Sequence, residues 1–298
     1  FSASSDVLAY SVGQSDRRLA WFDREGRSLG GVGEPGPFVQ VTLSPDGRRA
    51  IVIRESSLWI LDLERGGIAS RLTPDGYRTA DAAWSPDGRE IAMSARLSTT
   101  FDLYRLTLAA GAEPELVLSS EKNLWLNQWL AADNRLSFHD GFMIGLVPME
   151  GSHEPQEIVR QKGRLDETYR SPDGKWLAFI ADETGRFEVY VERLDTKERL
   201  RVSSEGGGQP RWRSDGRELF FLSSDAHVMA VDFDPELGAR GVARSLFEVP
   251  VAAVLPQVGQ WDVHPDGERF LFLVPAGEER TIHVVLNWRR LLEEDGSR

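Results

Sequence analysis

The stretch LSPDGRRAIV, residues 43–52, joins a four-residue turn to an apolar run. In Ser44-Pro45-Asp46-Gly47, proline presets the backbone at the second turn position, and glycine accepts the left-handed conformation that closes a tight hairpin. The residues after the turn are apolar and partly β-branched, which suits a strand buried between two sheets. This stretch therefore predicts a strand, a tight turn and a second strand.

The same turn recurs along the chain. The copies read WSPDGREIAM from residue 84, RSPDGKWLAF from 170, RSDGRELFFL from 213 and HPDGERFLFL from 264. A further copy, LAADNRLSF from residue 130, has lost the proline and the glycine, but Asn134 stands at the glycine position and asparagine tolerates the left-handed region. The turn aspartates lie 40 to 51 residues apart, and a period near 40 to 45 is typical of β-propeller blades.

This period predicts an all-β fold, a β-propeller of four-stranded antiparallel blades that forms one domain over residues 1–298. The paired second and third strands give seven blades, in which VLAYSV pairs with LAWFD in the first and RFLFL pairs with IHVVL in the last. The last unit has no visible fourth strand, so we expect the N- and C-terminal units to share a sheet and close the ring; extensive sharing would leave six blades. The units are approximately 1–37, 38–76, 77–122, 123–163, 164–205, 206–255 and 256–298.

Composition excludes several classes of function. With 35 Lys and Arg against 47 Asp and Glu, the net charge of -12 disfavours nucleic acid as a partner. Cysteine is absent, which removes disulfides and thiolate sites. No apolar run approaches the roughly 20 residues of a membrane span, so we expect no membrane insertion by these residues. The chain begins at Phe1 without a leader, which fits either a mature product or a piece of a longer protein, and we expect the piece.

The links into the inner strands predict a ligand site at the channel mouth, on the face opposite the Asp-Gly turns. Amide, guanidinium and phenol groups in a concave place can recognise a peptide, a glycan or an anion. The alternative is that these groups merely line a hydrated channel. The candidate residues are Phe38, Gln40, Arg78, Asp81, Asn127, Gln128, Asp166, Glu167, Tyr169, Gln209, Arg211, Gln257 and Gln260.

Several apparent catalytic motifs do not fit this architecture. Residues 26–30, GRSLG, match the hydrolase pattern G-x-S-x-G, and residues 31–36, GVGEPG, match the dinucleotide-binding fingerprint. Both patterns work only where a helix begins directly after the motif. The glycines and prolines that follow here prevent a helix from starting. The five histidines fall at different positions of the repeat, unlike a set of metal ligands. Asp166 with Glu167 could form a metal or acid/base pair, although adjacent carboxylates are usually solvated. We therefore predict no cofactor, no metal site and no catalytic residue.

The repeated SPDG, followed by an apolar strand and then DLY or EVY, resembles TolB-like, WD-repeat-like propellers over almost the whole chain. LAWFDREGRSLGGVGEPG, VSSEGGGQPRWRSDGRELFFL and HVVLNW further resemble the C-terminal propellers of bacterial membrane-anchored serine/threonine protein kinases. This resemblance implies an extracytoplasmic sensor or docking module, soluble by itself, whose parent protein carries the kinase and the membrane anchor. These residues contain no kinase motif.

The predicted function is therefore non-catalytic recognition. The propeller is expected to bind a protein, a peptide or a cell-envelope ligand such as a cell-wall fragment at the channel mouth. The alternatives are a gating propeller of a peptidase-like enzyme, a propeller hydrolase or lyase, and a spacer that only positions other domains.

Overall fold

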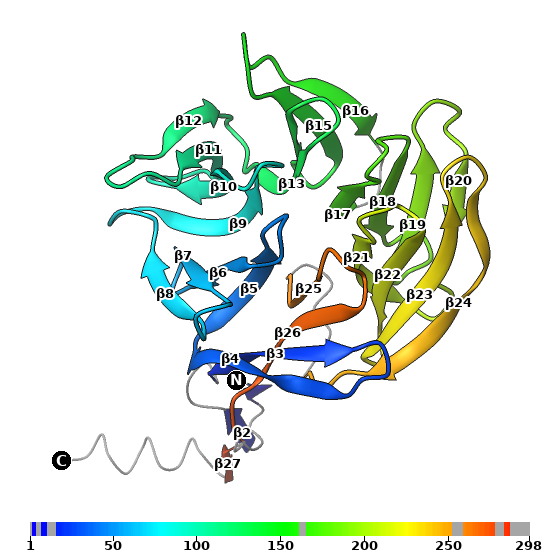
Figure 1. Cartoon of the computed structure of the whole chain (residues 1–298), viewed down its shortest axis with the longest axis horizontal. Coiled ribbons are helices and arrows are strands. Elements are labelled where there is room, and N and C mark those ends of the chain that lie inside the picture. Colours follow the sequence, from blue (N-terminus) through cyan, green and yellow to red (C-terminus); the bar gives the residue numbers. More distant parts are fainter. Residues whose placement is uncertain are drawn as a thin grey trace.

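The computed structural model describes residues 2–3, 7–10, 16–160, 165–251, 259–277 and 283–286. Six four-stranded antiparallel sheets surround a common centre (Figure 1). The first strand of each sheet lies nearest that centre. These inner strands are β5 (Phe38–Leu43), β9 (Arg78–Trp84), β13 (Trp125–Leu130), β17 (Leu165–Arg170), β21 (Gly207–Trp212) and β25 (Trp261–Val263).

The second and third strands form the middle of each sheet. The second strands are β6 (Arg49–Arg54), β10 (Glu90–Arg96), β14 (Arg135–His139), β18 (Trp176–Ala181), β22 (Glu218–Ser223) and β26 (Arg269–Pro275). The third strands are β7 (Ser57–Asp62), β11 (Asp102–Thr107), β15 (Met143–Pro148), β19 (Glu188–Arg193), β23 (His227–Asp234) and β3 (Arg17–Asp23).

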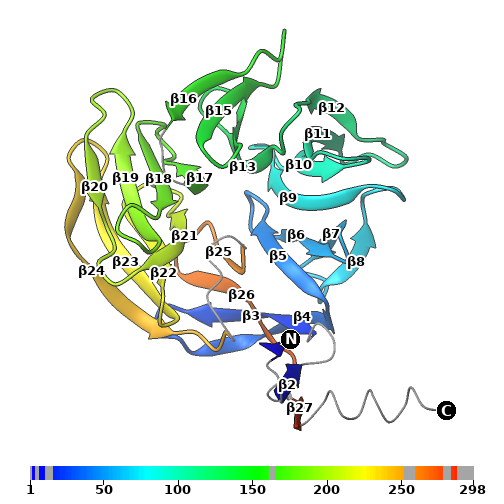
Figure 2. The same ribbon diagram turned by 180° about the vertical axis from the view of Figure 1, so that it is seen from behind.

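The outer strands form the rim of the ring, which Figure 2 shows from behind. They are β8 (Ile68–Arg71), β12 (Glu115–Leu118), β16 (Gln156–Arg160), β20 (Arg199–Arg201), β24 (Gly238–Glu248) and β4 (Ser28–Gly36).

The core lies between neighbouring sheets, which explains why the second strands are apolar on both faces. Every residue of β18, WLAFIA, is buried. In another part of the core, Phe270 and Phe272 of β26 share one cluster with Phe220 and Leu222 of β22, in the adjacent sheet. Burial on both faces removes the alternation of polar and apolar residues that a half-exposed strand would show.

The repeated turns have the predicted conformation. Gly47 has a φ of 70°, the N–H of Arg49 donates to Oγ of Ser44 at 2.9 Å, and the hydroxyl of Ser44 donates to Asp46 at 2.5 Å. Asn134 has a φ of 51°, so the prediction that it replaces the turn glycine in the left-handed region is confirmed. Each such turn directs the chain from an inner strand into the second strand of the same sheet.

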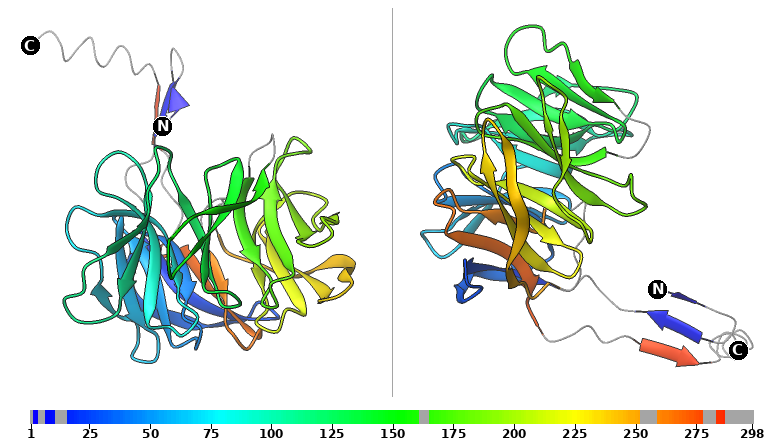
Figure 3. Two further views of the ribbon diagram at one scale, coloured as in Figure 1. Left: turned by 90° about the horizontal axis from the view of Figure 1, so that it is seen from above. Right: turned by 90° about the vertical axis from the view of Figure 1, so that its right-hand side faces the viewer.

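The structure has six blades, so the prediction of seven is wrong. VLAY and LAWFD do not pair: β2 (Val7–Tyr10) pairs with β27 (His283–Leu286) and β1 (Ser2–Ala3), while β3 pairs with β26. The three-stranded sheet β1-β2-β27 lies outside the ring (Figure 3). Units 1–37 and 256–298 therefore supply one blade between them, in the order β25-β26-β3-β4.

Neighbouring inner strands contact one another around the centre, from β5 through β9, β13, β17 and β21 to β25, and β25 contacts β5. Within the described residues, no helix has the length and apolar character needed to cross a membrane.

Candidate functional site

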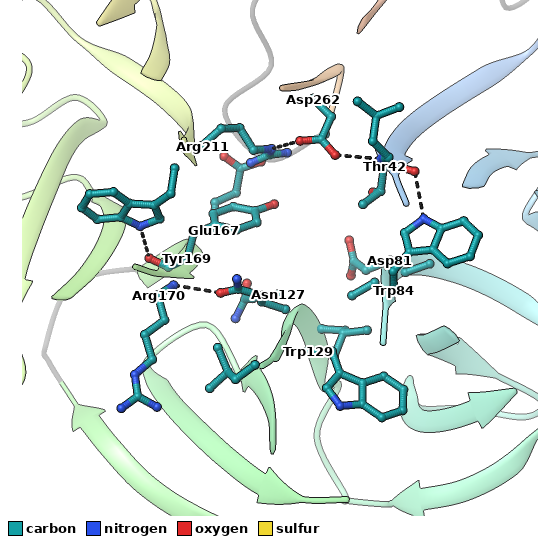
Figure 4. Close-up of a pocket in the computed structure, with 18 of the residues that line it drawn as sticks. Thr42, Asp81, Trp84, Asn127, Trp129, Glu167, Tyr169, Arg170, Arg211 and Asp262 are labelled. Carbon is teal, nitrogen blue, oxygen red and sulfur yellow. Dashed lines mark hydrogen bonds and ion pairs between the residues drawn. The ribbon is translucent and has the colours of Figure 1, made fainter. Parts of the chain in front are cut away.

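A cavity of about 770 Å³ lies at the centre of the ring (Figure 4). All six blades contribute to its wall. The cavity extends from Trp125 and His139 in the blade of β13 to turn residues such as Pro45 and Pro172. It therefore reaches the face of the Asp-Gly turns, which the sequence had placed opposite the site.

The candidate residues fall into three groups. Seven of them line the cavity: Gln40, Asp81, Asn127, Gln128, Glu167, Tyr169 and Arg211. Four do not: Phe38, Arg78, Gln209 and Gln260. The remaining two cannot be placed in this way, because the side chain of Asp166 and the whole of Gln257 lie outside the described residues.

Phe38 packs in the core with Val41 and Leu43, and a β-bulge explains why. The register of β5 against β6 shifts between Phe38 and Gln40. The extra residue in a bulge moves the preceding side chain to the other face of the strand. Gln40 therefore faces the channel while Phe38 does not. Arg78, at the start of β9, is exposed and away from the cavity.

Gln209 and Gln260 are buried and bind each other rather than lining the cavity. Nε2 of Gln209 donates to Oε1 of Gln260 at 3.0 Å, and the backbone N–H of Gln260 donates to Oε1 of Gln209 at 2.9 Å. Gln209 lies in a bulge of β21 with a φ of 54°. The two amides hold β21 to the segment before β25, so their polar atoms serve the contact between neighbouring blades.

Further polar side chains connect neighbouring inner strands in the same way. The backbone N–H of Arg170 donates to Oε1 of Gln128 at 2.9 Å, and that of Gln209 donates to Oε2 of Glu167 at 2.7 Å. Asp262 accepts from the N–H of Leu43 at 2.8 Å. Inner strands of different blades share no ladder, so their backbone groups need such partners. Some of the polar side chains that were predicted to bind a ligand therefore hold neighbouring inner strands together.

Tyr169, Arg211 and Asp262 form a polar cluster in the cavity wall. Cζ of Arg211 lies 4.2 Å from the ring centroid of Tyr169, and its Nε lies 3.7 Å from Oδ1 of Asp262. Nη1 of Arg211 donates to the carbonyl of Pro210 at 2.9 Å. The guanidinium is thus held on three sides and turned toward the phenol.

The pKa values in this cluster are set chiefly by burial. Burial raises the pKa of Tyr169, the charge of Arg211 lowers it, and the carboxylates of Glu167, Asp262 and Asp81 raise it further; the net shift is upward. The phenol therefore keeps its proton at neutral pH. Burial also raises the pKa of Asp262, more than the nearby charge of Arg211 lowers it.

Sequence reasoning missed Asp262 and the tryptophans of the wall. Nε1 of Trp84 donates to the carbonyl of Thr42 at 3.1 Å, and Nε1 of Trp212 donates to that of Tyr169 at 2.9 Å, each across a blade boundary. The recurrence of tryptophan just before the turns, in WSPDG and WRSDG, was a usable signal. Asp262 lies between the buried residues Trp261 and Val263. Because side chains alternate between the two faces of a strand, this pattern predicts that Asp262 points to the channel.

Among the described residues, no group of three or more histidine, aspartate or glutamate side chains is arranged to hold a metal ion.

Comparisons with known proteins support the fold. No protein-family model matches the chain. An uncharacterized protein of Agrobacterium fabrum is 26% identical over 257 residues, which cover 80% of this chain and 85% of that protein. The solved structure of a putative TolB from Agrobacterium tumefaciens has a TM-score of 0.71 at 22% identity and covers 92% of this chain and 99% of that one. The fold is that of a TolB-like β-propeller.

A second solved structure is of an enzyme. An oligogalacturonate lyase in complex with manganese has a TM-score of 0.57 at 14% identity, covering 83% of this chain and 76% of the lyase. At this identity the likeness concerns the fold. The resemblance to kinase-associated propellers stays a prediction.

Proposed function

We propose that the protein is a non-catalytic recognition propeller that binds a segment of a protein or peptide in its central cavity. The observation that carries this proposal is the cavity of about 770 Å³ with Asn127, Glu167, Tyr169 and Arg211 in its wall. A volume of several hundred Å³ with a few oriented polar groups is usual for ligand sites. The aromatic wall adds apolar contact area, which peptide side chains can use.

The proposal extends to the protein as a whole. The sequence resemblance supports a module on the extracytoplasmic face of a bacterial membrane, within a receptor-kinase-like parent that supplies the kinase and the anchor. The pairing of β26 with β3 supports a closed ring, in which the blade formed from both ends of the chain completes the cavity wall.

The test fills the cavity without removing any hydrogen bond. Ala80 lines the cavity, so an Ala80→Trp variant occupies the space that a ligand would need. Ala69, on the exposed outer strand β8, gives the matched control Ala69→Trp. Wild type and Ala69→Trp should capture the same partner from bacterial envelope fractions, and Ala80→Trp, with an unchanged melting temperature, should lose it. Equal capture by all three proteins would place recognition elsewhere.

A second candidate function is a propeller lyase, favoured by the likeness to oligogalacturonate lyase. Incubation with oligogalacturonate, with and without added Mn²⁺, should then produce the ultraviolet absorbance of an unsaturated sugar. Turnover that Glu167→Gln abolishes would replace the recognition proposal. A gating role beside a peptidase would instead require a hydrolase domain in the parent gene.

A further inference from the structure

Two arginines lie opposite each other in the blade β9-β10-β11-β12, at the end away from its Asp-Gly turn. Arg78 is the first residue of β9 and Arg96 is the last residue of β10, and the two are direct partners in the antiparallel ladder. Like charges at directly opposed positions of two strands are destabilising. In none of the other five blades that the structure describes do basic side chains occupy both of these positions. The pair is therefore particular to this blade and is not part of the repeat.

Neither arginine forms an ion pair with a carboxylate in the described part of the chain. Arg78 is exposed, and Arg96 lies over the ring of Phe101, with its Cζ 5.1 Å from the ring centroid. Asp102, opposite the residue before Arg96, accepts instead from the backbone N–H of Ser120 at 3.2 Å. The hairpin of the adjacent blade, whose Ser56 carbonyl accepts from the N–H of residue 79 at 2.7 Å, adds one charge of each sign, at positions 54 and 55. In a protein of net charge -12, this end of the blade therefore carries a local positive charge.

Apolar side chains connect the arginine pair to the central cavity. Phe101, below Arg96, packs against Trp125 with ring centroids 4.9 Å apart, and Trp125 lines the cavity. Leu97 follows Arg96 directly and is 55% exposed. A ligand that extends from the cavity at Trp125 therefore reaches an exposed leucine and two guanidinium groups in the same blade.

We propose that Arg78 and Arg96 together bind a carboxylate of the peptide that occupies the central cavity, and that an apolar side chain beside that carboxylate packs on Leu97 and Phe101. This inference rests on the proposed function and names an acidic peptide as the ligand. A carboxylate can accept from two guanidinium groups at once, so charges that repel each other in the free protein become favourable in the complex. The exposed leucine favours a peptide over a glycan, because a peptide combines a carboxylate with apolar side chains.

The test uses four leucine-containing peptides of equal length, all acetylated at the amino terminus, and an NMR signal beside the arginine pair. One peptide carries aspartate and an amidated carboxyl terminus, and one carries asparagine at that position and a free carboxyl terminus. Two amidated controls carry asparagine or lysine there. The indole signal of Trp125 reports binding, and that of Trp176, buried in another blade, serves as reference. At least one carboxylate peptide should bind about tenfold or more tightly than the amidated asparagine peptide, and added salt should weaken that binding.

Two charge-removing variants locate the carboxylate. Arg78→Gln and Arg96→Gln should each weaken binding of the carboxylate peptide about tenfold. Because each change also removes one of two opposed like charges near the surface, the melting temperature should stay nearly unchanged. The matched controls are Arg201→Gln and Arg217→Gln, at exposed arginines of other blades, and they should bind like wild type.

The outcomes separate this inference from the proposed function. If an amidated control peptide moves the Trp125 signal as strongly as the carboxylate peptides, or if the control variants weaken binding equally, the carboxylate assignment is wrong and channel recognition stands. If no peptide moves that signal, the assignment is also wrong, and the Ala80→Trp experiment decides the proposed function. Oligogalacturonate, tested beside the peptides, would overturn the peptide assignment if it alone moved the signal. The two carboxylate peptides together show whether the arginines take an acidic side chain or a free carboxyl terminus.

Discussion

At the scale of single residues, the turn glycines meet two separate demands. Gly47 has a φ of 70°, and a Cβ added there would lie 2.2 Å from Nε2 of His264. The His264 ring is not free to move away, because Asp266 and Arg269 bind it and Trp21 packs against it edge-on. Gly111 has a similar φ of 74° with nothing within 4 Å of the same position.

These two glycines allow backbone strain to be separated from crowding. We expect Gly111→Ala to cost about 1 kcal/mol, the penalty of the left-handed region alone. Gly47→Ala should cost about 2–3 kcal/mol, since His264 must also be displaced. Urea unfolding of both variants measures the difference. Equal losses of unfolding free energy in the two variants would mean that the contact of Gly47 with His264, between the turns of neighbouring blades, adds nothing to the cost of the substitution.

The sequence predicted the backbone conformation of the turn residues. It predicted only in part which inner-strand side chains face the channel. Asn134 could be assigned because few residue types tolerate positive φ. The orientation of Phe38 and Gln209 could not be predicted in this way. Each lies at a β-bulge, which reverses the face that a side chain takes, and residue types alone do not reveal a bulge. Tyr169 and Arg211 line the cavity, but their stacking on each other depends on two residues 42 positions apart in the chain, which the sequence does not reveal.

At the scale of elements, Glu218 connects two blades. It opens β22, and its side chain is 7% exposed. Arg24, in the turn after β3, binds it through both oxygens at 2.7 and 3.0 Å and also donates to the carbonyl of Gly267. Arg213 and Arg244 each contribute one further contact, at 3.0 and 2.7 Å.

Glu218→Gln should therefore destabilise the protein by about 3 kcal/mol, because it leaves three arginines around a neutral amide. Glu64→Gln offers a control, since Glu64 forms one pair with Arg48 at 3.4 Å and both side chains are more than 60% exposed. That change should stay within about 0.5 kcal/mol. Chemical unfolding at neutral pH measures both. A Glu218→Gln loss as small as that of the control would show that the blades are held by apolar packing alone.

The same carboxylate makes stability depend on pH in a defined direction. Burial alone would raise the pKa of Glu218, but hydrogen bonds and charges from Arg24 and the other two arginines bring it below the ordinary value of a glutamate. A carboxyl whose pKa is lower in the folded state stabilises at pH values above its unfolded pKa, near 4.3, and loses that contribution as the pH falls through the folded pKa.

We therefore expect the difference in stability between wild type and Glu218→Gln to be constant above about pH 5 and to shrink progressively below it. Unfolding free energies measured from neutral to acidic pH give this difference directly. A difference that grows on acidification would contradict the lowered pKa of Glu218.

Element pairing was the point at which sequence reasoning went wrong. The repeats identified the second and third strands of the blades, because each such pair follows a repeated turn and has its own apolar runs. VLAY and LAWFD were paired because strands adjacent in sequence usually form hairpins. Both instead pair with strands more than 240 residues away, and apolar composition does not distinguish one such partner from another.

At the scale of the whole molecule, the blade β25-β26-β3-β4 decides how the ring behaves as a unit. Phe272 is fully buried in it, stacked on Trp261 at 5.4 Å and edge-on to Phe22 at 5.7 Å. The surrounding core cluster includes Phe220 and Leu222 of the neighbouring blade. A change at Phe272 therefore weakens both the blade and its contact with the next one.

Phe272→Ala should cost about 3–5 kcal/mol, as large core truncations do. If the ring is closed and opens as one cooperative unit, amides in β26 and in the distant β18 should exchange faster by the same factor, because both are released by the same global opening. Hydrogen exchange of the wild type, of Phe272→Ala and of Val242→Ala, a control at a side chain 90% exposed on β24, measures this. Faster exchange confined to β26 and β3 would mean that this blade opens by itself. The cavity wall would then have a gate between β25 and its neighbours, and ligand entry would not be limited to the two faces of the ring.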